Sequence, residues 1–416
     1  PIEPAAMEDR QIIEWDKDDI DALRFMKVDV LALGMLTCMA KGLALIEAHK
    51  GVSYDLATIP PEDPRTYAMI RKADTLGTFQ IESRAQMAML PRMKPRTYYD
   101  LVVQVAIVRP GPIQGGAVHP FVRRKLGDEP VTYLHPKLVE PLQRTLGVPV
   151  FQEQLMQMAI DVDGFTGADA DRLRQAMGSR RSERRMAELA EKFRTGARAK
   201  GVEAETAEAI FSTIAAFANY GFPESHAISF ANLVYQSAWF KFHHHAAFTA
   251  GLLRAQPMGF YSPQSLVADA RRHGVLTHGP DVLASRARTD LETDEEHVGY
   301  RLETPGEQVQ GERAASGPAI RLGLDQVRGI STETAEQIVA ERERGGPFAS
   351  VPDLARRVRL TARQLEALAT AGDEVTSFRV VVNHELAEQP TMPIPVADFA
   401  GSRQEQQHGA GGLDPE

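Results

Sequence analysis

The strongest constraint on this sequence is a basic stretch, residues 172–200, inside an otherwise acidic chain. The stretch holds ten Lys and Arg residues against three Glu, whereas the whole 416-residue chain carries a formal net charge of −9. Gly178 and Ser179 divide it into two segments with helical patterning, and Ser179 or Ser182 could cap the second helix. Positive charge concentrated in this way indicates a surface that holds an anion, with the first-turn amides of the second helix pointing toward it. The alternative is an ordinary solvated helix face.

Composition limits the class of protein. With 25% charged and 43% hydrophobic residues, the sequence is typical of a globular chain of about two to four domains. Its single cysteine, Cys38, excludes a disulfide framework and a thiolate metal cluster, which fits a reducing cytoplasm. No apolar run approaches the ~20 residues that a membrane span needs, and no signal-peptide pattern opens the chain. We therefore expect a cytoplasmic protein without a membrane partner.

Residues 25–31 predict a buried strand that contains one carboxylate, Asp29. A carboxylate in an apolar strand is costly unless it is paired or bound to a metal. Both interpretations stay open: Asp29 is satisfied by a neighbouring lysine or by backbone amides, or it is a metal ligand. Residues 33–50 then predict an amphipathic helix, residues 77–81 a short strand, and Ser83 the cap of a further helix.

Two turns carry candidate phosphate ligands. Arg109 precedes the rigid turn Pro110-Gly111-Pro112, which would hold its guanidinium in one direction, and a planar guanidinium suits phosphate. Ser225 and His226 follow a Gly-Phe-Pro turn and begin a helix predicted over about 227–243. A helix start with an aromatic side chain nearby could hold a nucleotide. The alternatives are an ordinary surface turn and a capped core helix with a satisfied histidine.

Residues 319–372 resemble a helix-hairpin-helix module. Its turn, Arg328-Gly329-Ile330-Ser331, would expose backbone amides at a helix start, and such amides grip a DNA phosphate without reading sequence. A generic helical hairpin is the alternative. Residues 261–317 contain short strand-like pieces and a low-complexity stretch, which predict a linker or a small β-element. Helical periodicity ends at residue 373, and we expect disorder beyond it.

Several motifs together resemble the bacterial C-family DNA polymerases, the family of the DNA polymerase III alpha subunit. They are WDKDD at 15–19, KVDVLALGML at 27–36, GTFQIESR at 77–84, VRPGP at 108–112, FQEQLMQMA at 151–159, LRQAMGSRRS at 173–182 and YGFPESHAISFANL at 220–233. Two further motifs, GFYSPQSLVADARRHGV at 259–275 and RLGLDQVRGIS at 321–331, are most similar to the error-prone, damage-inducible branch. The resemblance covers roughly residues 10–372.

The resemblance implies a mainly α fold with small β elements. Its parts would be the end of the palm (1–55), the fingers (56–285), a linker or small β element (286–318), the helix-hairpin-helix module (319–372) and a disordered or non-native tail (373–416). The family continues after Gly372 with an apolar helical segment, which this sequence lacks. A reading-frame shift or a truncation is our hypothesis for that tail.

The resemblance also implies a reaction, the template-directed addition of deoxynucleotides to a primer 3′ end. Two Mg²⁺ ions would activate the primer hydroxyl and neutralise the triphosphate. Asp29 would be the third palm carboxylate, both catalytic and metal-binding. The residues implied to line the incoming nucleotide are Arg109, Arg174, Arg180, Arg181, Ser225 and His226. Those implied to contact DNA are Arg328, Gly329, Ile330 and Ser331.

The implied partners are primer-template DNA, deoxynucleoside triphosphates, the sliding clamp and damage-response accessory proteins. The family's other two metal-binding aspartates would precede residue 1, as would its polymerase-and-histidinol-phosphatase-like domain. We therefore expect this chain alone to be inactive. The alternative function is a non-catalytic DNA-binding fragment that uses the basic helix and the hairpin. A nuclease would need a separate carboxylate cluster, which the sequence does not present.

Overall fold

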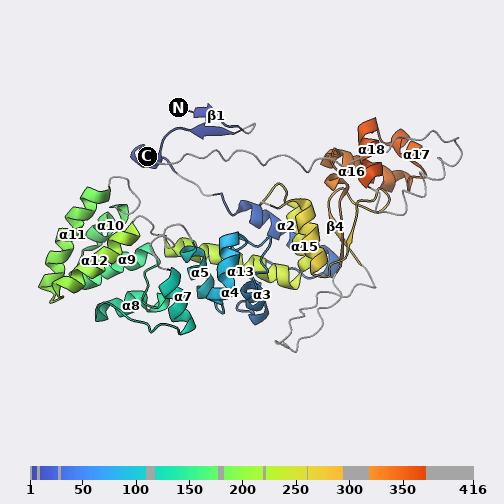
Figure 1. The fold of residues 1–416 in the computed structure, drawn as a ribbon. Coiled ribbons are helices and arrows are strands. Elements are labelled where there is room, and N and C mark those ends of the chain that lie inside the picture. The colour runs from blue at the N-terminus through green and yellow to red at the C-terminus, as the bar shows by residue number, and fades with distance from the viewer. Residues whose placement is uncertain are drawn as a thin grey trace, which may run out of the picture.

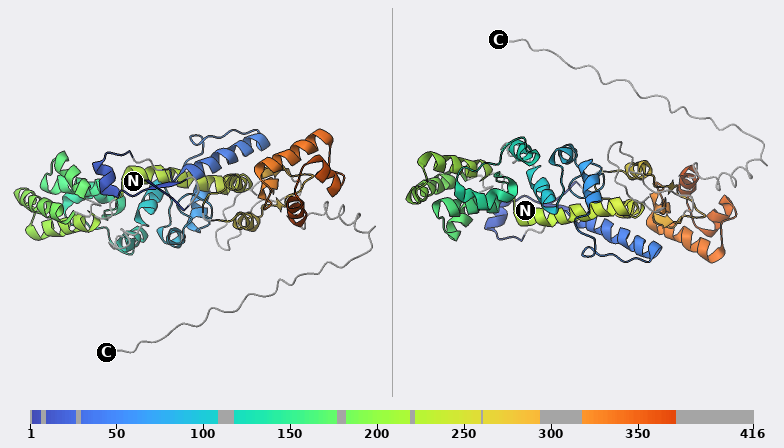
Figure 2. Two further views of the ribbon diagram at one scale, coloured as in Figure 1. Left: turned by 90° about the horizontal axis from the view of Figure 1, so that it is seen from above. Right: turned by 90° about the horizontal axis from the view of Figure 1, so that it is seen from below.

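The structure is a computed structural model that describes residues 2–6, 10–26, 30–108, 118–176, 182–218, 222–259, 261–293 and 318–371. It is mostly helical with small sheets, as the sequence predicted. Figures 1 and 2 show an elongated arrangement, in which the helices of residues 152–218 lie at one end and those of residues 332–371 at the other. A long helix, residues 224–243, runs through the middle. No helix among these residues is long and apolar enough to cross a membrane.

The N-terminal segment forms a small hairpin rather than a buried strand. Strands β1 (Ile2–Pro4) and β2 (Gln11–Ile13) pair antiparallel, and the short helix α1 (Lys17–Ala22) follows. The predicted buried strand over 25–31 is wrong in its described parts, residues 25–26 and 30–31. These residues are not in a strand, and their side chains are 48–88% exposed. The described residues offer this stretch no strand to pair with, because β1 and β2 pair only with each other.

The middle of the molecule is built on two close helix contacts. Helix α2 (Leu33–Lys50) packs against α14 (His245–Arg254), and α13 (Glu224–His243) packs against α5 (Tyr98–Ile107). Gly42 lies where α2 crosses α13 and α14. A Cβ on it would lie 2.5 Å from the Phe240 ring, so only glycine permits the close approach.

Helices α3 (Pro64–Arg71) and α4 (Arg84–Met93) flank the segment where the sequence predicted a strand over 77–81. That prediction is wrong: the segment is a series of turns, with φ of +80° at Gly77 and +63° at Gln80. The backbone N–H of Phe79 donates to Ser237 Oγ at 3.0 Å instead of to a neighbouring strand. Ser83 caps α4 as predicted, because its side chain accepts from Gln86 N–H.

The far end of the molecule is a helical cluster. It contains α9 (Gln152–Asp163), α10 (Gly167–Ala176), α11 (Ser182–Ala199) and α12 (Ala204–Ala218). The elements that precede it in the chain are α7 (Val118–Leu126), the 3-10 turn Pro136–Leu138, α8 (Val139–Leu142) and the 3-10 turn Gln143–Thr145. Phe193 of α11 packs against Phe165 and Phe211. The basic stretch therefore forms parts of two helices, as predicted, and residues 177–181 between them lie outside the described residues.

A three-stranded sheet connects the middle to the other end. Its order is β3 (Thr277–His278), β5 (Ala319–Arg321), β4 (Asp290–Glu292), with β5 parallel to β3 and antiparallel to β4. Before β3, the sequence predicted strand-like pieces, but residues 263–272 form helix α15 (Pro263–Arg272). The Ser262 side chain caps α15 and Pro263 occupies its first turn, which is a strong helix-start arrangement.

The C-terminal module has a core of its own. It comprises a 3-10 turn (Leu324–Gln326) and helices α16 (Thr332–Gly345), α17 (Val351–Arg357) and α18 (Ala362–Ala371). Leu324, Ile338 and Leu354 are fully buried in this core. Residues 372–416, which include the predicted tail, lie outside the described residues.

Candidate nucleic-acid interface

The turn before α16 exposes its main chain. Val327 and Ile330 are each 5% exposed and anchor the turn in the module core, and the Ile330 amide donates to the Val327 carbonyl at 3.0 Å. Arg328 and Gly329 stand out between these anchors. Gly329 has φ of +94°, and a Cβ there would meet no atom within 4 Å. The fold therefore holds glycine in a left-handed conformation beside open space, an arrangement that lets a ligand approach the backbone.

The turn leads directly into the N-terminus of a 14-residue helix. Ser331 is its N-cap: the side chain accepts from the Thr334 amide at 3.1 Å. The predicted DNA contacts thus divide into two kinds. Arg328 and Gly329 are exposed, whereas the Ile330 side chain is buried and the Ser331 hydroxyl serves the cap. The positive end of the helix favours an anion at this place.

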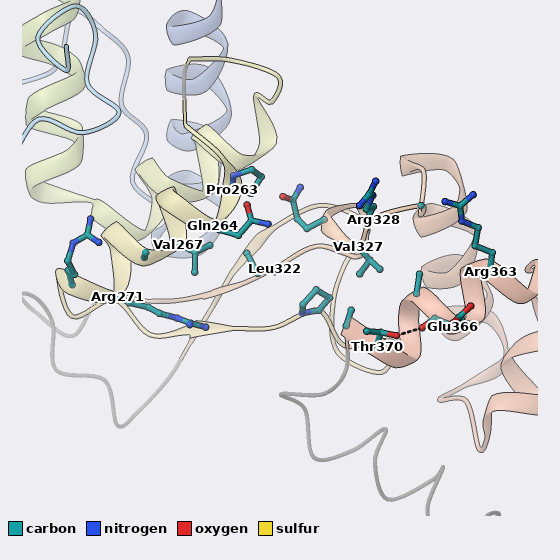
Figure 3. A pocket seen from close by; sticks show the side chains of 17 residues that line it. Pro263, Gln264, Val267, Arg271, Leu322, Val327, Arg328, Arg363, Glu366 and Thr370 are labelled. Carbon is teal, nitrogen blue, oxygen red and sulfur yellow. Dashed lines mark hydrogen bonds between the residues drawn. The ribbon is translucent and has the colours of Figure 1, made fainter. Parts of the chain in front are cut away.

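A groove of about 1040 Å³ adjoins the turn. Figure 3 shows Val267 and Gln264 of α15 on one side, Glu366 and Thr370 of α18 on the other, and Leu322 between them. The cationic residues that line the groove are Arg271, Arg272, Arg328 and Arg363. Glu366 is the single carboxylate among the lining residues. The groove is therefore cationic around an apolar floor.

A buried ionic network fixes α15 to the middle of the molecule. The Lys241 side chain is fully buried, and its Nζ lies 3.1 Å from both Asp269 Oδ2 and Asp74 Oδ1. It also donates to the Leu76 carbonyl at 3.0 Å. His273 Nε2 lies 2.6 Å from Asp74 Oδ2. Each buried charge therefore has an opposite partner, which is the condition for stable burial.

One group of described residues has ligand atoms close enough for a metal: His245, Asp269 and His273 lie within 4.8 Å of one another. The group does not fit a metal centre. The Asp269 carboxylate already bonds the Lys241 ammonium, which would repel a cation, and His273 bonds Asp74. The two imidazole rings are stacked at 4.4 Å, so their ring-plane lone pairs do not converge. Burial keeps the pKa of His245 well below its usual value.

Ser225 and His226 lie in the first turn of α13, as the sequence predicted. Ser225 is exposed, and the His226 ring lies between Phe222 and Phe230, at centroid distances of 5.1 and 4.1 Å. The backbone N–H of Glu224 donates to Glu153 Oε2 at 2.9 Å. A carboxylate of the protein therefore already occupies the first amide at this helix start.

Arg174 lies on α10, where its guanidinium pairs with Asp171 at 2.9 Å one turn away. The side chain is 49% exposed, and among the described residues its ion pair is with Asp171 rather than with a residue at the start of α13. Arg172, Lys192 and Arg194 are also paired with carboxylates, for example Lys192 with Asp169 at 2.6 Å. These cations of the basic stretch are thus compensated by nearby carboxylates.

Four of the predicted site residues lie outside the described residues. They are Asp29, Arg109, Arg180 and Arg181. The structure therefore describes the turn predicted to contact DNA and the Ser225-His226 helix start, and it does not bring them together. The turn belongs to the C-terminal module, whereas the helix start lies at the N-terminal end of α13.

Sequence reasoning missed the wall of the groove formed by α15. Arg271 and Arg272 are the last residues of that helix, and Arg363 is the second residue of α18. The sequence did contain a signal for helix α15. Ser262-Pro263 is typical of a helix start, and two arginines in the last turn are favoured by the helix dipole. Sequence reasoning also missed the ionic network of Lys241, because the partners of this lysine are distant in the sequence and cannot be identified from the residues around it.

Two family models match the chain. One is described as "Bacterial DNA polymerase III alpha subunit finger domain" and matches residues 35–201. The other is described as "Helix-hairpin-helix motif" and matches residues 274–377. Helix α15 falls between the two matched ranges.

Curated relatives match over most of this chain. An "Error-prone DNA polymerase" from Mycobacterium tuberculosis is 54% identical over 373 residues, which is 89% of this chain and 32% of the relative. One from Nocardia farcinica is 56% identical over 379 residues, covering 90% of this chain and 31% of the relative. "Error-prone DNA polymerase 1" of Agrobacterium fabrum is 53% identical over 380 residues, with 91% and 34% covered. The chain thus spans about a third of the length of the curated relatives it matches.

Proposed function

Because this chain belongs to the bacterial C-family DNA polymerases, the family of the DNA polymerase III alpha subunit, we propose that it serves error-prone, template-directed DNA synthesis. The observation that carries the proposal is the identity of more than half of its residues to error-prone DNA polymerases over about nine tenths of the chain. The exposed turn at Arg328 and Gly329 supports it independently, because such a turn suits contact with a DNA backbone.

In this proposal, the chain contributes residues that orient the nucleotide and hold the duplex. Arg174, Ser225 and His226, with Arg109, Arg180 and Arg181, contact the incoming nucleoside triphosphate. The Phe222 and Phe230 rings on either side of His226 limit the directions in which its imidazole can turn. Guanidinium groups neutralise the triphosphate without themselves reacting.

Divalent metal ions, in our proposal Mg²⁺, would supply activation of the primer hydroxyl and charge neutralisation of the leaving group when bound. Asp29 is the proposed carboxylate ligand in this chain. The clustered His245, Asp269 and His273 are not part of this site, because Lys241 and Asp74 already satisfy two of them.

Primer extension tests the catalytic part of the proposal. The chain is mixed with a polypeptide that carries the two further palm aspartates, and extension of a labelled primer is measured. We expect Asp29→Asn to abolish extension while leaving duplex binding intact. Asp128→Asn is the matched control, because Asp128 is an exposed carboxylate that belongs to none of the motifs. Full extension by Asp29→Asn would remove the proposed metal role.

Nucleotide titration tests the binding residues. Arg174→Gln and His226→Gln should raise the KM for the deoxynucleotide more than they lower kcat, because they remove ground-state contacts. The matched control is Arg198→Gln, an exposed cation of the same basic stretch that the proposal leaves unused. An equal rise in the KM of Arg174→Gln and Arg198→Gln would show that only the overall charge of the basic stretch matters.

The second candidate is a non-catalytic DNA-binding fragment, favoured by the exposed turn at the start of α16. It predicts duplex binding with a steep salt dependence and no nucleotide binding. Equilibrium dialysis with a labelled deoxynucleotide separates the two candidates. Partners beyond DNA, namely deoxynucleotides, the sliding clamp and damage-response proteins, are proposed from the resemblance, as is a cytoplasmic location.

A further inference from the structure

We infer that the groove between α15 and the hairpin module binds the backbone of duplex DNA, so that α15 and the hairpin grip one duplex together. The inference rests on the proposed function, because it extends the contact made by the turn at Arg328 and Gly329. Neither matched family model includes α15. The proposed wall of DNA-binding residues on α15 therefore lies outside both matched ranges.

Two of the four cations that line the groove, Arg328 and Arg363, have no carboxylate partner among the described residues. Arg363 stands in the first turn of α18, where the helix dipole disfavours a cation. Arg328 lies in the turn before Ser331, the N-cap of α16, where the same argument applies. Both side chains are exposed, and neither pairs with a carboxylate of the described residues. Phosphate in the groove would compensate both cations, and the helix ends would add to its binding.

The opposite wall adds two further arginines at the end of α15. Arg271 donates to the Thr277 carbonyl at 3.5 Å, and Arg272 pairs with Asp269 at 3.0 Å while its side chain stays 62% exposed. Both of these residues line the groove. The groove therefore presents cations from two sides, which suits a polyanion that passes through it rather than a single small anion.

The lining of the groove favours duplex backbone over single-stranded DNA. Its residues include no aromatic ring, whereas proteins that bind single strands stack bases on aromatic side chains. The floor is aliphatic, with Leu322, Val327 and Val267. Such a surface can lie against deoxyribose while the arginines reach phosphate. Contact of this kind positions the duplex without reading its sequence.

The two walls are held at a fixed separation. Lys241 and Asp269 anchor α15 on one side. The strand after α15, β3, pairs with β5, which leads into the hairpin module: the Ile320 amide donates to the Leu276 carbonyl at 2.8 Å. Ala246, Ala270 and Ile320 pack together behind this junction. The cations are therefore arranged before DNA arrives, which reduces the entropy lost on binding.

The test measures duplex affinity by fluorescence anisotropy between about 50 and 200 mM salt. Each phosphate contact contributes about 0.9 to the slope of log K against log salt concentration. We expect Arg271→Gln and Arg363→Gln each to lower that slope by about 0.9. Arg359→Gln is the matched control, because Arg359 is an exposed cation of the same module that does not line the groove. It should leave the slope unchanged.

Arg328→Gln separates the inference from the proposed function. If the unmodified chain binds no duplex, or if Arg328→Gln binds as tightly as the unmodified chain, the proposed hairpin contact fails. If Arg328→Gln weakens binding while Arg271→Gln and Arg363→Gln keep the full slope, only the groove inference fails. An equal loss of slope in Arg359→Gln would also overturn it, because binding would then follow net charge. Circular dichroism checks that the exposed substitutions leave the fold intact.

Discussion

Replacing Lys241 by methionine tests how strongly the buried ionic network holds α15. Methionine keeps most of the side-chain volume but removes the ammonium, which lies 3.1 Å from both Asp74 and Asp269 and is wholly inaccessible to solvent. Breaking a buried ion pair by removing one partner costs about 3–5 kcal/mol, because the remaining charge stays buried without compensation. We expect a loss of unfolding free energy in this range.

The loss should depend on pH through His273. Burial lowers the pKa of His273, but its hydrogen bond to Asp74 and the nearby carboxylate charges outweigh burial, so the pKa of His273 is raised overall. A raised histidine pKa contributes stability that is complete below about pH 6.5 and is lost as the pH rises through the folded-state value. In Lys241→Met, the remaining cations of the network are Arg272 and protonated His273, and of these two His273 is the one that loses its charge between pH 6 and pH 8.5. The variant should therefore lose more stability at pH 8.5 than at pH 6.

Urea unfolding of Lys241→Met is followed by the fluorescence of Trp239, which is 4% exposed and lies on α13 two residues before position 241. Trp15→Phe provides a background in which Trp239 is the single tryptophan. Arg194→Met is the matched control: its pair with Glu208 is exposed, so its loss should cost less than about 1 kcal/mol. Adding Asp269→Asn to Lys241→Met should restore part of the stability. A loss below about 1 kcal/mol for Lys241→Met, or no recovery in the double variant, would refute the reasoning.

Three further predictions concern the core. Burial raises the pKa of Asp163 to about 7, so the stability that its protonated form provides is complete below about pH 4, near the ordinary aspartate pKa, and is lost progressively as the pH rises to 7. Asp163→Asn keeps an acceptor for the Phe165 amide and should stabilise the chain on the order of 2 kcal/mol at pH 8.5, with little change at pH 4 in thermal unfolding. Gly42→Ala should destabilise by about 1–3 kcal/mol in urea unfolding, since its Cβ would overlap the Phe240 ring. Cys38 is fully buried and its thiol pKa is raised, so a thiol reagent should modify it only after unfolding; rapid labelling of the native chain would contradict this.

The sequence predicted best those features that depend on neighbouring residues. The cap at Ser83 and the start of α13 were predicted from the residues next to them. The turn at Gly329 was predicted in the same way, because a glycine just before a helix indicates a tight turn. The prediction of a strand over 77–81 was wrong because two residues there have a left-handed backbone conformation, which the apolar pattern does not indicate. One of these residues is Gln80, which is not a glycine. A distant side chain, Ser237, takes the amide that a strand would have used.

The candidate site was predictable only in part, for the same reason. The turn at Arg328 is local, but the groove needs α15 and α18 to become neighbours, and residues 272 and 363 are far apart in the chain. Their meeting depends on β5 entering the sheet beside β3, a pairing of only two residues on each strand. Strands that short give almost no periodic signal in a sequence.

The order of that sheet has a practical consequence for dividing the protein. The middle strand, β5, comes last in the chain, and both of its neighbours come from before residue 293. A single backbone cleavage between residues 293 and 318 would leave the two fragments joined by hydrogen bonds on both edges of β5. Separately expressed halves should therefore reassociate, which makes this position a natural place to build a split protein whose complementation reports on assembly.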